Sequence, residues 1–423
     1  MLKKAVQEVK KPLIGVLAAA ILISAPISTF AEKADDAHKT KSKAKTAKVV
    51  KMPKLPIESE AVYLYDMNLN KVVYSKKPNK VLPTASLAQI MSLYLASDAL
   101  TSGKVKANEK VKISEKAWRT PGSRMFLEIG REVPFGELFK GVAVVSGNDA
   151  SVAMAEYLEG STSAFVEKMN DKAKELNMTK TKFRSVNGLP EGDKEDTSTA
   201  KDLGAMTTSY LKKYPGNLAI HSMKQYNFDT GREVIEQTNR NPLLQSYGAA
   251  DGLKTGWVEG SYNLIGTAEK DGVRLVVVTL KGESEQIRAK DARTLLDYGF
   301  NQYKKYVFDK KGDKVETLPV YKSAEAKKAN LVMKDDLELI IHTSQLSKKN
   351  KIKEKVVIPD YINAGKGLKA GDVVGKKQIF IGKKLIHETD IVVKEDIEKG
   401  SWWQKGLDSV LLSGMWVMGL FKG

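Results

Sequence analysis

Alternating and helical patterns of apolar residues follow one another between residues 57 and 306. The run Ala61–Val72 has the alternation of a strand, and apolar residues recur at helical spacing from Ser86 to about Leu100. Near the end of this segment, Tyr262–Ala268 and Val273–Leu280 are strand-like runs on either side of Asp271-Gly272. An Asp-Gly pair between two such runs is a strong signal for a β-hairpin.

Two further helices are expected inside this segment. One covers Ser161–Asn177, with Thr162 or Ser163 as its cap, and another begins near Ser198 and stops before Pro215. Strands at both ends with helices between them predict an α+β fold. We expect an antiparallel sheet whose first and last strands come from opposite ends of the segment, with a helical cluster beside it.

The helical pattern fades between residues 307 and 398, where short strand-like runs separated by turns replace it. These runs are Lys314–Tyr321, Leu337–His342, Lys353–Ile358, Gln378–Ile381 and Ile386–Val393. They predict a small all-β C-terminal domain.

The first 31 residues have the pattern of a secretory signal. Lysines precede an apolar run from Leu13 to Ala25, and the small residues before Glu32 suit a cleavage site. The run is too short for a spanning helix, although an uncleaved anchor is the alternative. Residues 32–56 are rich in lysine and predict a solvated linker. We therefore expect export to the cell envelope.

Residues 399–423 are apolar and rich in tryptophan, with a polar stripe on one face. The polar residues are Lys405, Asp408, Ser409 and Ser413. This pattern favours an amphipathic helix in a membrane interface, where Trp402 and Trp403 would lie at the level of the headgroups. The alternative is a helix packed on the β domain. We expect peripheral attachment to the outer face of the cytoplasmic membrane.

Charge and composition narrow the possible partners. The net charge of +18 suggests an anionic neighbour, but no basic stripe interleaved with aromatic residues appears, so nucleic acid is not expected. The chain has no cysteine and only four histidines, without metal-binding spacing, so neither a metal nor another cofactor is expected. A Ser-His-Asp triad would require His221, which lies in a strand-like run, Leu218–Tyr226, and is expected to be packed or exposed instead.

Three short segments carry residues suited to acyl transfer from an amide. Ser86 lies at a helix start, where free N–H groups can donate to an oxyanion. The segment Ser146-Gly147-Asn148 offers a hydroxyl and an amide, and Lys254-Thr255-Gly256 offers a positive charge on an expected edge strand, to which a peptide can add. Each segment alone is equally consistent with a cap or a turn. Their order is the one that a serine acyl-transfer enzyme needs.

Together the segments resemble the low-molecular-mass penicillin-binding D-alanyl-D-alanine carboxypeptidases, over roughly residues 57–306. Further segments resemble sequence motifs of this family: Pro121–Met125, Ser146–Ala150, Asn187–Pro190, Ser198–Ala200, Asp251–Gly256 and Leu295–Phe300. The resemblance implies a serine β-lactamase/transpeptidase-like fold and the D-Ala-D-Ala end of a peptidoglycan stem peptide as substrate. The β domain and the terminal helix match the usual layout of the family.

The resemblance also implies roles for individual residues. Ser86 would form the acyl-enzyme, and β-lactams would acylate the same serine. Ser146 and Asn148 would be the second motif. Lys254 and Thr255, followed by Gly256, would bind the terminal carboxylate and polarise the site. Arg288 would assist with the carboxylate, with a surface arginine as the alternative.

Two residues depart from the family pattern: Trp257 follows the third motif, where a smaller or polar residue is common, and the other departure lies in the first motif. The first motif should read Ser-x-x-Lys, but the chain has Gln89 three residues after Ser86. A glutamine amide can hydrogen-bond a hydroxyl but cannot accept its proton near neutral pH. Three hypotheses follow: a carboxypeptidase with impaired turnover, a non-catalytic penicillin- or peptidoglycan-binding relative with a regulatory role, and a β-lactamase-like hydrolase. Lys254 acting through Ser146 is a conceivable substitute base.

Overall fold

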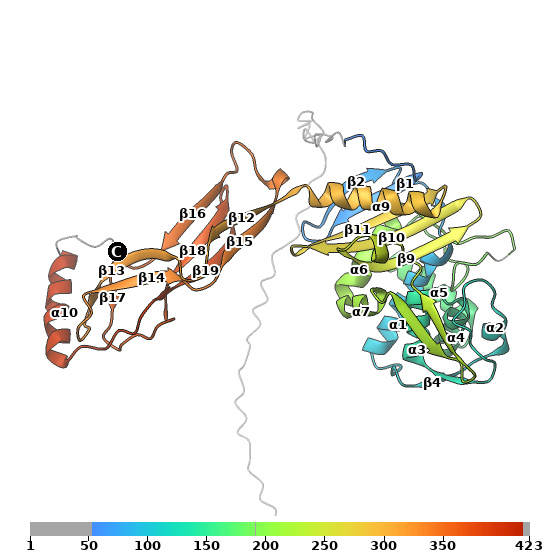
Figure 1. Cartoon of the computed structure of the whole chain (residues 1–423), viewed down its shortest axis with the longest axis horizontal. Coiled ribbons are helices and arrows are strands. Elements are labelled where there is room, and N and C mark those ends of the chain that lie inside the picture. Colours follow the sequence, from blue (N-terminus) through green and yellow to red (C-terminus); the bar gives the residue numbers. More distant parts are fainter. Residues whose placement is uncertain (1–52, 191, 418–423) are drawn as a thin grey trace, which may run out of the picture. The chain divides into compact units, whose positions relative to one another are not determined.

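The computed structural model describes residues 53–190 and 192–417. The expected signal segment, most of the linker and the last six residues lie outside this range. The described residues form a part with a sheet and helices, followed by an all-β part and a terminal helix (Figure 1).

The first part is built on a five-stranded antiparallel sheet in the order β2-β1-β11-β10-β9. Its strands are β1 (Ala61–Asp66), β2 (Lys71–Lys76), β9 (Ala250–Val258), β10 (Ser261–Lys270) and β11 (Val273–Gly282). β1 pairs with β11, with Ala61 opposite Leu280, so the sheet joins the two ends of the segment as expected. The hairpin at Asp271-Gly272 is confirmed, and the run Ala61–Val72 contains a turn between two strands.

Helices cover both faces of this sheet (Figure 1). Side chains alternate between the faces of a strand. Val276 and Val278 of β11 accordingly pack with the helical cluster, while Leu275 and Val277 pack with Leu295 and Leu296 of α9. The helices are α1 (Gln89–Thr101), α2 (Glu115–Arg119), α3 (Phe135–Val145), α4 (Asn148–Glu159), α5 (Thr162–Glu175), α6 (Ala200–Lys213), α7 (Leu218–His221), α8 (Leu243–Ser246) and α9 (Glu285–Phe300), with the 3₁₀ turns η1 (Ala85–Ala88) and η2 (Pro215–Asn217).

Short strand pairs complete the helical side. They are β3 (Leu82–Pro83) with β6 (Thr197–Ser198), β4 (Lys110–Lys112) with β5 (Glu132–Pro134), and β7 (Gln225–Asp229) with β8 (Val234–Thr238).

Two local predictions were wrong. The cap of α5 is Ser161, whose hydroxyl accepts from the N–H of Ala164 at 3.1 Å, and neither Thr162 nor Ser163 caps it. The expected strand Leu218–Tyr226 is instead the short helix α7 followed by the start of β7, and His221 ends that helix.

The C-terminal part contains a six-stranded sheet in the order β16-β18-β19-β14-β13-β17 and the pair β12-β15. The strands are β12 (Tyr303–Asp309), β13 (Lys314–Tyr321), β14 (Lys328–Met333), β15 (Leu337–His342), β16 (Ile352–Val357), β17 (Ile362–Asn363), β18 (Val373–Ile381) and β19 (Lys384–Val393), with the 3₁₀ turn η3 (Thr343–Gln345). The sequence pattern places the boundary between the two parts at residue 306, which lies inside β12. The strands β12, β14 and β17 were not among those expected from the sequence.

The chain ends in α10 (Trp402–Val417). The amide of Gln404 donates to the carbonyl of Ala324 at 2.9 Å, and the carboxylate of Asp408 accepts from the N–H of Lys322. Among the described helices, none has both the length and the apolar character needed to cross a membrane.

Candidate active site

Ser86 lies in η1, the 3₁₀ turn that leads directly into α1. The preceding residue, Ala85, has a φ of +49°, which is uncommon for a residue with a side chain. The N–H of Gln89 bonds back to the carbonyl of Ser86, so the two residues lie one turn apart. Leu87 and Ala88 are fully buried, whereas Ser86 is only half-buried and lines a cleft.

Two glycines pack against the turn that carries Ser86. A Cβ atom on Gly188 would lie 2.1 Å from the carbonyl oxygen of Ala85, and one on Gly256 would lie 2.6 Å from the carbonyl oxygen of Thr84. Real Cβ atoms do not approach a backbone oxygen so closely. Both positions therefore require glycine, and the Ser86 turn packs between β9, which carries Gly256, and the loop that carries Gly188.

Gln89 is fully buried and connects the first segment with the second. Its Nε2 donates to Oδ1 of Asn148 at 2.9 Å and to the carbonyl of Ser146 at 3.3 Å. Its Oε1 accepts from the hydroxyl of Ser146 at 3.0 Å. All these partners are neutral, so the position one turn after Ser86 organises the site but carries no charge.

Ser146 and Asn148 occupy the junction of two helices. Ser146 follows the last residue of α3 in the left-handed region, with φ +62°, and Asn148 begins α4. The side chain of Asn148 donates to the carbonyl of Pro121 at 2.9 Å, and its N–H donates to the carbonyl of Ser123 at 2.7 Å. These bonds tie the Pro121–Met125 segment to the second segment.

Lys254 lies on β9, which is an edge strand of the sheet, as expected. Its side chain is buried, and Nζ donates to Oγ of Ser146 at 2.7 Å and to the carbonyl of Thr255 at 3.1 Å. Burial lowers the pKa of Lys254 to about 7, with smaller contributions from the charges of Arg240 and Arg288. Since an unperturbed lysine has a pKa near ~10.4, this amine is the group in the site best suited to exchange a proton near neutral pH.

Arg288 lies on α9 and is buried, so the alternative of a surface arginine is wrong. Its Nη1 donates to the carbonyls of Gly256 at 3.2 Å and Asn263 at 3.3 Å, and its guanidinium pairs with Glu285. Burial lowers the pKa of Arg288. The arginine thus fixes the end of β9 and brings a positive charge to the cleft.

The cleft has a volume of about 1160 Å³ and draws its lining from all three segments. Ser86, Ser146, Asn148, Thr255, Gly256 and Arg288 line it. Gln89 and Lys254 are buried behind this lining and reach it through Ser146. All eight residues expected at the site therefore lie together.

Arg240 also lines the cleft, on the loop between β8 and α8, and was missed by sequence reasoning. It is exposed, and its positive charge acts on Lys254. No spacing rule points to it, because a loop residue is brought to the cleft by the fold alone. Trp257, next to the third segment, lies at the rim with 59% of its surface exposed.

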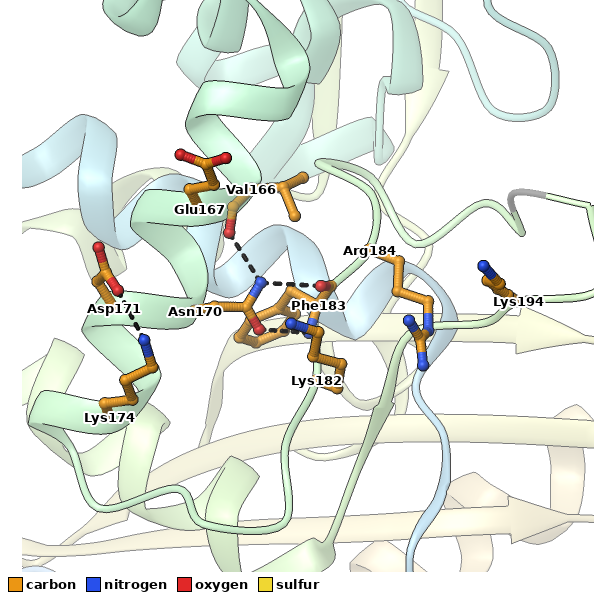
Figure 2. Close-up of a pocket in the computed structure, with 9 residues that line it drawn as sticks. All are labelled: Val166, Glu167, Asn170, Asp171, Lys174, Lys182, Phe183, Arg184 and Lys194. Carbon is orange, nitrogen blue, oxygen red and sulfur yellow. Dashed lines mark hydrogen bonds and ion pairs between the residues drawn. The ribbon is translucent and has the colours of Figure 1, made fainter.

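The loop that brings Leu189 and Pro190 to the cleft starts after Phe183, which is bonded to α5. Figure 2 shows the hydrogen bonds of Asn170 at this point. The side chain of Asn170 on α5 donates to the carbonyls of Val166 and Phe183, both at 2.9 Å, and accepts from the N–H of Phe183 at 3.0 Å. Phe183 is fully buried beside it. One amide on α5 therefore positions the start of the loop.

His221 is not part of the cleft. It is fully buried, and its Nε2 lies 3.0 Å from the hydroxyl of Tyr210. Burial, followed by the charge of Lys254, lowers the pKa of His221 to about 3, so the imidazole is neutral. The expectation that it is packed rather than catalytic agrees with this placement.

Comparison with known proteins identifies the family. A family model described as D-alanyl-D-alanine carboxypeptidase matches residues 45–284, and a model of the penicillin-binding protein 5 C-terminal domain matches residues 303–399. The chain belongs to the D-alanyl-D-alanine carboxypeptidase family.

Similar members of the family include the D-alanyl-D-alanine carboxypeptidases DacF of Bacillus subtilis and DacC of Escherichia coli. DacF is 33% identical to this chain over 82% of this chain and 87% of its own length. DacC is 32% identical over 84% of this chain and 88% of its own length. Penicillin binding protein 5 from Haemophilus influenzae is a structural neighbour at 28% identity, with a TM-score of 0.58 over 82% of this chain and all of that chain. Penicillin-binding protein D2 from Listeria monocytogenes in the ampicillin-bound form is a second structural neighbour, at 29% identity. Its TM-score is 0.54, and the match covers 59% of this chain and all of that chain.

For a member of this carboxypeptidase family, the central departure is the neutral amide of Gln89. The amide fills its position with three hydrogen bonds to the second segment. The site therefore keeps its organisation around Ser86, while the only lysine in the three segments is Lys254.

Proposed function

We propose that this protein is a serine D-Ala-D-Ala carboxypeptidase that removes the terminal D-alanine of peptidoglycan stem peptides through an acyl-enzyme on Ser86. The observation that carries the proposal is the buried amine of Lys254, 2.7 Å from the Ser146 hydroxyl, in the cleft that Ser86 lines. The names of the similar family members support the reaction type.

In the acylation step, Oγ of Ser86 bonds to the carbonyl carbon of the penultimate D-alanine. Its proton passes to Oγ of Ser146 as the Ser146 proton passes to neutral Nζ of Lys254. The backbone N–H of Ser86 donates to the oxyanion. When the amide bond breaks, the ammonium of Lys254 returns a proton through Ser146 to the leaving amine. Water then attacks the ester carbonyl as its proton passes along the same path to Lys254. The bond between the acyl carbon and Oγ of Ser86 breaks, the proton returns to this Oγ, and the shortened peptide leaves as its carboxylic acid.

The substrate would lie along β9 as an additional strand, because this edge of the sheet is open to the cleft. The amide of Asn148 faces the same cleft and can bond a substrate carbonyl. The terminal carboxylate would lie near Thr255, beside the positive charges of Arg288 and Arg240. β-Lactams, which mimic this end of the peptide, would acylate Ser86.

Two measurements test the proposal. D-Alanine release from a D-Ala-D-Ala peptide and labelling by a fluorescent penicillin are compared between the parent and Ser86→Ala. We expect both signals in the parent and neither in the variant. Labelling of Ser86 without any D-alanine release would support the non-catalytic relative instead. Rapid hydrolysis of the penicillin would support the β-lactamase-like hydrolase.

We also propose that the protein is exported and lies on the outer face of the cytoplasmic membrane, held by residues 399–423. The face of α10 that contacts the β domain includes Asp408 and Ser409 of the polar stripe. The opposite face exposes large apolar side chains, with exposed fractions of 66% for Trp403, 71% for Leu407 and 74% for Val410. An apolar face turned away from its own domain suits a membrane surface. In this division of the chain, residues 57–306 carry the reaction and residues 307–398 connect them to the anchor.

A further inference from the structure

One end of the six-stranded sheet gathers lysines from the loop before β16, from β16 itself and from the β18–β19 turn. They are Lys348, Lys349, Lys351, Lys353, Lys355, Lys383 and Lys384, and we call this set the lysine-rich end. All of these side chains are exposed.

The loop and the turn are held next to each other by backbone bonds. Ile352 at the start of β16 pairs with Ile381 at the end of β18, and Ile381 pairs with Lys384. The N–H of Gly382 donates to the carbonyl of Lys351 at 3.0 Å. The lysines therefore form one surface, although they come from two segments about 30 residues apart in the chain.

The chain itself does not neutralise this surface. Within the described part of the chain, none of these lysines forms an ion pair with a carboxylate. The acidic residue between them, Glu354, pairs with Lys377 at 2.9 Å. Because successive side chains of a strand point to opposite faces, Lys353 and Lys355 project away from Glu354. The positive charge is thus open to an external anion.

The anchor helix lies at the other end of the same sheet (Figure 1). α10 contacts the chain just after β13, at Lys322 and Ala324. β14 pairs with β13 on one side and with β19 on the other, and these registers place the last residues of β13 beyond Val393, the end of β19. The lysine-rich end lies at Lys384, the start of β19. β19 alone separates the two by roughly 30 Å at ~3.3 Å per residue. With α10 in the membrane interface, as proposed above, a surface this far along the sheet can reach beyond the lipid headgroups.

We propose that the lysine-rich end is a second binding site for peptidoglycan, which it holds through the carboxylates of the peptide stems. The proposal rests on the proposed function, because peptidoglycan is then the polyanion within reach of a protein anchored at its opposite end. Phe380, the aromatic residue opposite Lys353 on β18, is half-buried rather than exposed for stacking on bases, which disfavours nucleic acid. A polymer held at this end raises the local concentration of stem peptides, as in any two-site binder.

The test compares two full-length variants that lose the same charge. One carries Lys349→Gln, Lys351→Gln, Lys353→Gln, Lys383→Gln and Lys384→Gln. The control carries glutamine at exposed lysines of the first part, namely Lys106, Lys112, Lys168, Lys224 and Lys270. The probe is insoluble peptidoglycan stripped of attached phosphodiester polymers, in co-sedimentation at several salt concentrations. We expect the first variant to bind about tenfold more weakly with a shallower salt dependence, and the control to match the parent.

Equal binding by both variants would overturn the proposal. So would binding that occurs only before the phosphodiester polymer is stripped, which would identify that polymer as the ligand. If the first variant lost binding to vesicles of phosphatidylglycerol and phosphatidylcholine but kept binding to peptidoglycan, the ligand of the lysine-rich end would be lipid and the proposal would be wrong. Penicillin labelling of Ser86 and D-alanine release from a short soluble peptide should be unchanged in the first variant. Their absence in the parent would contradict the proposed function, separately from the sedimentation result.

Discussion

The Nζ atom of Lys254 lies 2.7 Å from Oγ of Ser146, at the point where the second and third segments meet. The same hydroxyl donates to Oε1 of Gln89 at 3.0 Å. Ser146 is therefore bonded to one group that can change its protonation state near neutral pH and to one that cannot. This asymmetry leads to two predictions about the chemistry.

The rate of Ser86 acylation should rise with pH through a midpoint near 7 and then level off. Burial lowers the pKa of Lys254 to about 7, and only the neutral amine, which predominates above that pH, accepts a proton. Fluorescent-penicillin labelling measured between about pH 5 and pH 9 checks the profile. Arg240→Gln removes a nearby positive charge and should move the midpoint to higher pH. A rate that falls through pH 7 would mean that the ammonium acts as a fixed charge instead.

Gln89→Lys should increase D-alanine release, because its amine could act on Ser86 directly whereas Lys254 acts through Ser146. The usual contribution of a positioned general base, about 10²–10⁴-fold, is the upper bound of the gain. The new amine would lie one helical turn from Ser86, among the atoms that now bond the amide. Gln89→Met is the matched control, because it has a similar length and provides no base. Equal release by the parent and the lysine variant would show that the Lys254 path already supplies the full effect.

Gly256→Ala should reduce Ser86 acylation by about 10²-fold, because a new Cβ would meet the backbone oxygen of Thr84 and displace the catalytic turn. Penicillin labelling gives the rate, and thermal unfolding reports any general loss of stability. Gly216→Ala is the control, since a Cβ there has no heavy atom within 4 Å. If Gly256→Ala acylates at the parental rate, the close packing of β9 against η1 does not position Ser86.

Trp402→Ser combined with Trp403→Ser should weaken binding to phospholipid vesicles by at least about tenfold, since each exposed indole contributes apolar area to the interface. Deletion of residues 401–423 should abolish it. Vesicle pelleting measures both effects. Trp257→Ser is the control for loss of an exposed tryptophan outside α10. A truncated protein that still pellets would place the membrane contact elsewhere.

Local patterns were sufficient for much of the fold and the site. The Asp271-Gly272 turn identified the hairpin, and β13 and β15 have the expected bounds. The three segments converge because β9 packs against η1, a contact between residues far apart in the chain that the order of the segments indicated.

Other features depend on tertiary context and could not be inferred locally. Arg240 reaches the cleft from a loop, and the pKa of Lys254 depends on burial that only the folded chain provides. The expected strand around His221 failed because its apolar residues pack as one short helical turn beside Tyr210. The terminal helix α10 was expected, but the direction of its polar stripe follows from its contact with Lys322.

The exposed edge of β9 has a consequence for substrate choice. A strand recognises an added peptide mainly through main-chain groups, which are the same for every residue. If the substrate adds to this edge as proposed, discrimination would fall on its two terminal residues, which would contact Ser86 and the carboxylate site. Stem peptides that differ only upstream of these residues should be processed at similar rates, so one enzyme of this kind would serve walls of differing composition.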